Sequence, residues 1–205
     1  MNLRTAIVAA ALAAAAAPAS AVTYLPVGPQ KDVSISTVTA GGWTLCYSAL
    51  FGTPFGTSAA TTLAACTGER LLLAGRLTGS DNLLVLAQTT VTDALNPTGA
   101  ADNGVFTTSN GADWFYNDGW SWGFKPIGVG FTKFQCAFGP PDASICIHTL
   151  DFVGGFSVNT VGGLNGSVDY EKLVFTSGDV VVPAPATLAL LGLGLGLVAL
   201  GRRRG

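Results

Sequence analysis

The side chains best suited to catalysis are few in this sequence, and they lie around a single histidine. His148 is the only histidine among 205 residues, so a serine hydrolase would need it as general base, with Asp142 or Asp151 to orient the ring. No Gly-x-Ser-x-Gly motif is present to place a nucleophilic serine. Cys146 shares a strand face with His148 in an alternating stretch, but a cysteine in a disulfide is no thiolate nucleophile. We therefore expect no catalytic residue and a structural role for His148.

Carboxylate pairs of the kind that hydrolyse glycosidic bonds are not indicated by any local pattern. Glu69 and Glu171 are the only glutamates, and the aspartates occur mostly in turn strings such as Asn117-Asp118-Gly119. Aspartate and asparagine favour turns because their side chains bond nearby backbone groups. A pair at catalytic separation could still arise in the fold, so a secreted hydrolase remains a distant third hypothesis.

Oxygen donors gather in one segment and raise the question of calcium. Asp102, Asn103, Asp113, Asn117 and Asp118 lie within 17 residues. Their spacing does not match the alternating ligands and distal glutamate of an EF-hand loop. Loops of a β domain can assemble an ion site from scattered oxygens, and ordinary loop polarity is the alternative. We predict that the protein needs no metal or cofactor, with a Ca²⁺ site left open.

The most unusual local feature is a group of aromatic residues around the turn Asn117-Asp118-Gly119. If this segment is a hairpin, Trp114 and Tyr116 share one face of the first strand, and Trp120 and Trp122 share one face of the second. Such a stripe is usually part of a core or a cross-strand cluster. If exposed, the four rings would form a platform for stacking on sugar rings. Solvent exposure of Trp120 and Trp122 distinguishes the two interpretations.

Four cysteines, Cys46, Cys66, Cys136 and Cys146, indicate disulfides if the chain is exported. Three pairings are possible. We favour Cys46–Cys66 and Cys136–Cys146, because each pair lies in one sequence neighbourhood and the second brackets a Gly-Pro-Pro-Asp turn. A zinc site is disfavoured because the spacings contain no C-x₂-C and only one histidine is available.

Turn signals recur every 8 to 12 residues between the two ends of the chain, and helix periodicity is scarce. This pattern predicts an all-β fold: one antiparallel β-sandwich or barrel-like domain over residues 22–182, held by two disulfides. The segment 58–65 is equally compatible with a helical turn or a strand. The expected strands are 33–38, 43–49, 71–77, 83–90, 114–116, 121–124, 131–137, 144–150 and 170–176.

Residues 1–21 have the composition of a signal peptide. Arg4 precedes an uninterrupted apolar run, and small residues stand at Ala19 and Ala21. We predict export, with cleavage by signal peptidase between Ala21 and Val22.

Residues 183–205 form a second terminal signal. Val182, Pro183, Ala184 and Pro185 precede sixteen uncharged, mostly apolar residues, which are followed by Arg202, Arg203 and Arg204. Sixteen helical residues span roughly 24 Å, so the helix crosses a bilayer core of about 30 Å only marginally. The arginines resist translocation and keep the domain on the side away from the cytoplasm. This favours a short transmembrane helix that anchors the protein only transiently. The arrangement is analogous to a GPI signal, whose hydrophobic tail is removed.

The Pro-Ala-Pro box, the Leu/Gly-rich helix and the arginine cluster together resemble the PEP-CTERM sorting signal of Gram-negative bacteria. The resemblance implies recognition by exosortase, a membrane-embedded cysteine transpeptidase, cleavage near the box, and release to the surface or extracellular matrix. The sequence departs from the pattern at Ala184, where the family has glutamate. More loosely, segments such as Gly42–Tyr47 and Trp120–Phe124 look similar to an uncharacterised cysteine-containing module of secreted proteins, which implies no particular activity.

Between the two terminal signals, six Lys and Arg stand against twelve Asp and Glu, a net charge of −6. Phosphate binding needs clustered cations, so nucleic acid is excluded as a partner. We therefore expect a non-enzymatic protein of the cell surface or extracellular matrix. A carbohydrate-binding module for exopolysaccharide is the alternative.

Overall fold

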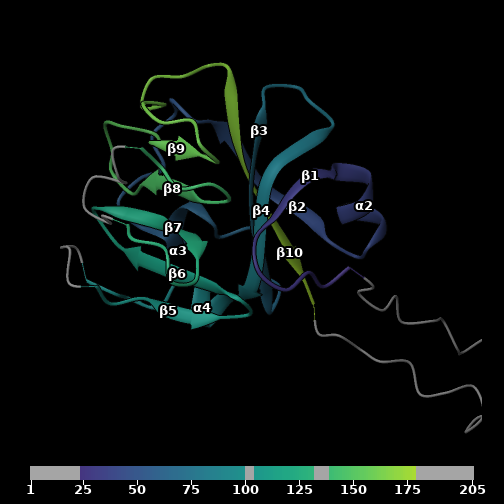
Figure 1. Cartoon of the computed structure of the whole chain (residues 1–205). Helices are drawn as coiled ribbons and strands as arrows, with labels where there is room; N and C mark the ends of the chain where they lie inside the picture. Colours follow the sequence, from purple (N-terminus) through teal and green to yellow (C-terminus); the bar gives the residue numbers. More distant parts are fainter. Residues whose placement is uncertain (1–23, 100–103, 132–138, 179–205) are drawn as a thin grey trace, which may run out of the picture. The chain divides into compact units, whose positions relative to one another are not determined.

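Antiparallel strands make up most of the described chain. The computed structural model describes residues 24–99, 104–131 and 139–178, and its strands form two five-stranded sheets (Figure 1). Two predicted segments lie outside the described residues. They are the signal peptide with its cleavage residues Ala19, Ala21 and Val22, and the sorting signal over 183–205 with Val182 before it.

The first sheet, called sheet A, has the strand order β1-β4-β3-β10-β2, with every neighbouring pair antiparallel. The strand nearest the C-terminus, β10, lies inside the sheet between β3 and β2. The bounds are β1 Gln30–Ser34, β2 Thr44–Leu50, β3 Arg70–Leu77, β4 Asn82–Thr90 and β10 Tyr170–Ser177.

The second sheet, called sheet B, has the sequential order β5-β6-β7-β8-β9. Its centre is the predicted aromatic hairpin, in which Tyr116 pairs with Trp122 and Gly119 supplies a positive φ of 77° at the turn. The bounds are β5 Thr107–Ser109, β6 Ala112–Asn117, β7 Ser121–Pro126, β8 Ile145–His148 and β9 Ser157–Val158.

Alternate side chains of both sheets form one shared core. Leu73 of β3 and Val174 of β10 belong to the same buried cluster as Trp122 of β7 and Ile147 of β8. This confirms the all-β prediction of antiparallel sheets, because strands place successive side chains on opposite faces. The barrel alternative is wrong for the described residues, since β1 and β2 end sheet A without pairing to each other.

The outer face of sheet A is covered by a short helix where the sequence predicted a strand over 33–38. Strand β1 ends at Ser34, and helix α2 follows over Ile35–Ala40 (Figure 1). The Ser34 hydroxyl accepts a hydrogen bond from the Thr37 amide at 3.1 Å, and such a cap favours a helix start. The helix buries Val38 against Leu72 and Phe175. This apolar residue of the predicted strand is therefore buried as expected, but it lies on a helix.

Other local expectations differ in detail. The ambiguous segment 58–65 contains the helical turn α3 over Ala59–Thr62, and a similar turn, α4 over Val91–Ala94, follows β4. The short strands β5 and β9 were not expected, because two or three residues give no periodic signal. Strand β8 is shorter than the predicted 144–150. Most of the strand predicted over 131–137 lies outside the described residues.

One of the two predicted disulfides is confirmed. Cys46 of edge strand β2 is bonded to Cys66 in the connection before β3. Cys146 of β8 is also disulfide-bonded, whereas Cys136, its predicted partner, lies outside the described residues.

The first described residues form hydrogen bonds with both sheets. The Pro26 carbonyl accepts hydrogen bonds from Gln88 Nε2 of β4 at 2.9 Å and from Asn110 Nδ2, beside β5, at 2.8 Å. The Gly28 amide donates to the Asn110 carbonyl at 2.7 Å. This segment therefore links sheet A to sheet B immediately after the predicted cleavage site.

Candidate functional site

Of the two interpretations of the aromatic residues on the β6–β7 hairpin, the core is right for three of the four rings, and an exposed row of rings is wrong. Trp114 and Trp122 are both 0% exposed, and Tyr116 is 7% exposed. They lie on the inner face of sheet B, which sheet A covers. Trp122 packs against Phe55 with ring centroids 5.4 Å apart and donates from Nε1 to the Ala94 carbonyl at 3.0 Å. These rings therefore belong to the core.

Trp120 is the member of the predicted set that reaches solvent, with 38% of its surface exposed. It lies at the end of the hairpin turn, where its backbone is fixed by Thr149 after β8. The Trp120 amide donates to Thr149 Oγ1 at 2.9 Å, and the Thr149 amide donates to the Trp120 carbonyl at 3.1 Å. The side chain is thus presented at the surface by a well-bonded turn.

Asp118 lies in the same turn and ties it to helical turn α3. Its carboxylate accepts hydrogen bonds from the Tyr116 hydroxyl and from the Ala59 amide, the latter at 3.3 Å. The pKa of Tyr116 is raised to about 12, mainly by burial and to a smaller extent by the hydrogen bond to Asp118. Tyr116 therefore stays protonated near neutral pH and serves as a donor within the fold.

His148, at the end of β8, packs beside an aromatic ring. Its ring meets Phe156 edge to face with centroids 5.9 Å apart. Burial lowers the pKa of His148, a hydrogen bond with the Trp120 backbone partly opposes this, and the charge of Lys172 lowers it further. Of the two aspartates considered for a triad, Asp142 forms an ion pair with Lys31 at 2.7 Å and Asp151 lies exposed on the loop after β8.

The described oxygen donors of the possible calcium site do not converge. Asp113 is engaged on the outer face of sheet B by Lys125 Nζ at 2.6 Å and by Thr108 Oγ1 at 2.6 Å. Burial raises the pKa of Asp113, but those hydrogen bonds and the charge of Lys125 outweigh it and leave the pKa below its usual value. Within residues 24–99, 104–131 and 139–178, no three acidic, histidine or cysteine side chains are placed to hold a metal. Asp102 and Asn103 lie outside these ranges.

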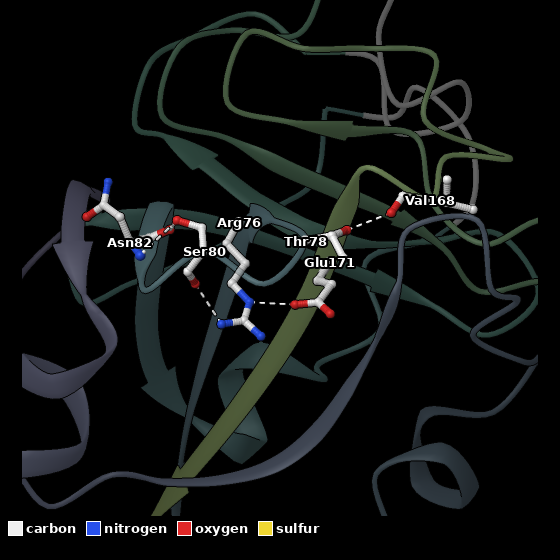
Figure 2. Close-up of polar contacts among 6 residues, drawn as sticks. All are labelled: Arg76, Thr78, Ser80, Asn82, Val168 and Glu171. Carbon is white, nitrogen blue, oxygen red and sulfur yellow. Dashed lines mark hydrogen bonds and ion pairs between the residues drawn. The ribbon is translucent and has the colours of Figure 1, made fainter.

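A polar cluster at one end of sheet A was not foreseen from the sequence. Figure 2 shows Arg76 of β3 reaching Glu171 of β10, with Nε 2.5 Å from Oε2. Arg76 also donates to the Ser80 carbonyl at 2.7 Å, and Thr78 donates to the Val168 carbonyl at 2.6 Å (Figure 2). These contacts join the β3–β4 turn to the segment that leads into β10.

Lys172 is a further polar side chain that sequence reasoning missed. It lies on β10 with 0% exposure, and burial lowers its pKa to about 7. Its Nζ donates to three backbone carbonyls, those of Phe51, Thr53 and Gly154. The available signal was its position in Tyr-Glu-Lys-Leu-Val-Phe, where alternation places Lys172 on the same face as Val174.

No protein-family model, curated protein or solved structure matches this chain. In the described part of the chain, no helix is both long and apolar enough to span a bilayer. The apolar tail 186–201 lies outside that part.

Proposed function

We propose that this chain is an exported, non-enzymatic protein of the cell surface or extracellular matrix, processed by signal peptidase and an exosortase-type transpeptidase. The observation that carries the proposal is the Cys46–Cys66 disulfide, because disulfides persist in oxidising compartments outside the cytosol. The two terminal signals predicted from the sequence lead to the same compartment. The domain would be delivered outward and held briefly at the inner membrane by the tail.

Intact-mass analysis of the protein from envelope and medium tests this proposal. We expect a chain that begins at Val22 and has lost the segment after the Pro183-Ala184-Pro185 box, with no free thiol before reduction. A variant with Arg202, Arg203 and Arg204 replaced by glutamine should retain the tail, whereas Ala184→Glu should be cut at least as well as the parent. Full-length, reduced protein in the cytosol would contradict the proposal.

Binding of exopolysaccharide is the second candidate function, now centred on Trp120 instead of on a row of rings. The supporting observation is that Trp120 is 38% exposed, two positions after Asp118, in a turn held by Thr149. An indole stacks on the apolar face of a sugar ring, and carboxylates accept hydrogen bonds from sugar hydroxyls. Asp118 would supply such an acceptor.

Trp120→Ala is expected to weaken binding of the full chain to exopolysaccharide from the producing strain by about threefold to tenfold. Ring contacts contribute roughly 0.5–1.5 kcal/mol beyond area burial, and 1.4 kcal/mol corresponds to tenfold. The measurement is co-sedimentation with the purified polymer. Phe152→Ala is the matched control, because Phe152 is 77% exposed on another loop. Equal affinity of parent and Trp120→Ala, or no binding by the parent, would remove this candidate.

A further inference from the structure

The Lys172 ammonium lies where β10 meets two loops. Its Nζ is 3.3 Å from the Phe51 carbonyl and 2.5 Å from the Thr53 carbonyl, both in the connection after β2. It is 2.8 Å from the Gly154 carbonyl, in the connection between β8 and β9. The Lys172 side chain of sheet A thus donates hydrogen bonds to the loop that follows β2 of sheet A and to the loop that follows β8 of sheet B.

The two loops are packed too closely for these carbonyls to turn easily toward water. A Cβ atom at Gly154 would lie 2.0 Å from the Phe51 carbonyl oxygen, and one at Gly155 would lie 2.6 Å from the Phe51 ring. Buried carbonyls need donors. An ammonium has three N–H donors, one for each carbonyl, whereas a neutral amine has two.

Few charged groups surround this amine. On β10 itself, Glu171 faces the opposite side of the sheet and pairs with Arg76 of β3. From β8, His148 is near enough for the charge of Lys172 to lower its pKa, and Asp151 lies exposed on the following loop. From β2, the neighbouring inward titratable group is Tyr47, whose pKa burial raises to about 12. No ion pair with Lys172 occurs among the described residues.

We propose that Lys172 is a proton-operated latch, whose ammonium holds the Phe51–Thr53 and Gly154 backbones on β10 and whose deprotonation frees one of the three carbonyls. The latch is a conformational device within the domain and does not depend on the proposed function. Its operation is local, since a neutral amine keeps two N–H donors, enough for one carbonyl of each loop.

The direction of the pH effect follows from the two protonation equilibria. Burial lowers the pKa of Lys172 from 10.5 to about 7 in the folded chain. Below pH 7 both folded and unfolded chains carry the proton, and the cost of burying the charge is fully present. Between pH 7 and pH 10.5 only the unfolded chain keeps the proton, so global stability rises with pH. The latch therefore loosens locally over the pH range in which the whole fold becomes more stable.

A lysine titration by NMR tests the latch directly. The full chain, in a neutral detergent and labelled with ¹³C at lysine Cε and ¹⁵N in the backbone, has four lysines, so Lys172→Met identifies the signal. We expect the Cε signal to titrate with a midpoint of about 7. The amides of Gly52 and Gly155, which follow two of the bonded carbonyls, should shift with the same midpoint. The folding equilibrium constant should rise by up to about tenfold per pH unit between about pH 7 and pH 9, and lose this rise in Lys172→Met.

Two further variants separate Lys172 from its neighbours. Lys31→Met, at an exposed lysine, should leave both amide midpoints unchanged. His148→Gln should also keep them, because His148 is not the group that bonds the loops. A Lys172 midpoint near 10.5, static amides at Gly52 and Gly155, or loss of their shifts in His148→Gln would overturn the proposal. If Lys172→Met does not fold, the parent and His148→Gln titrations still decide the question.

Discussion

Trp122→Ala is expected to lower the free energy of unfolding by about 3–5 kcal/mol, the usual cost of truncating a buried tryptophan. The indole is 0% exposed between the two sheets and packs on Phe55. Its removal leaves a cavity between the two sheets. It also removes the donor that satisfies the Ala94 carbonyl at 3.0 Å.

The measurement is urea unfolding of the full chain followed by far-ultraviolet circular dichroism, which does not depend on the deleted fluorophore. Trp120→Ala is the matched control, because it removes the same side chain two residues away at a position 38% exposed. That control should lose no more than about 1 kcal/mol. Equal losses for the two variants would mean that Trp122 does not lie in the core.

Loss of the Cys46–Cys66 disulfide is expected to cost about 3 kcal/mol. The bond closes a loop with a sequence separation of 20 residues, and chain-entropy estimates for loops of this length give about that value. Here the bond also joins edge strand β2 to the connection that leads into interior strand β3. Without it, we expect β2 to fray from β10 before the rest of sheet A unfolds.

The Cys46→Ala/Cys66→Ala double variant isolates this bond, because a reductant would also open the disulfide of Cys146. Urea unfolding gives the change in stability, and hydrogen exchange of the amides of 44–50 reports the expected fraying. Adding reductant to the double variant measures what the bond of Cys146 contributes. A double variant as stable as the oxidised parent would show that the bond marks the compartment without stabilising the fold.

Much of the sheet structure could be predicted from local pattern. The runs that became β3, β4, β7 and β10 alternate or stay apolar over strand lengths, and turn residues bound them. The prediction failed where a single polar contact outweighed the pattern. At Ser34 the side-chain cap turned an alternating stretch into α2. At Trp114 and Trp122 the pattern placed the rings on one face correctly, but it could not tell whether another sheet would cover that face.

The Cys46–Cys66 pairing was also within reach of the sequence, because short separations bring cysteines together in many folds. Lys172 was not. A lysine in a strand is ordinarily exposed, and its burial depends on carbonyls contributed by loops more than a hundred positions and about twenty positions earlier in the chain. No local window contains those acceptors.

The amino-acid sequence by itself determined the β class, the positions of most of the longer strands and the Cys46–Cys66 pairing, because each depends on neighbours along the chain or on composition. Only the tertiary structure decided which aromatic rings are buried, that Trp120 alone of the predicted four reaches solvent, and that Lys172 is enclosed. These outcomes depend on which surface packs against which, and burial is a property of the contact between distant segments.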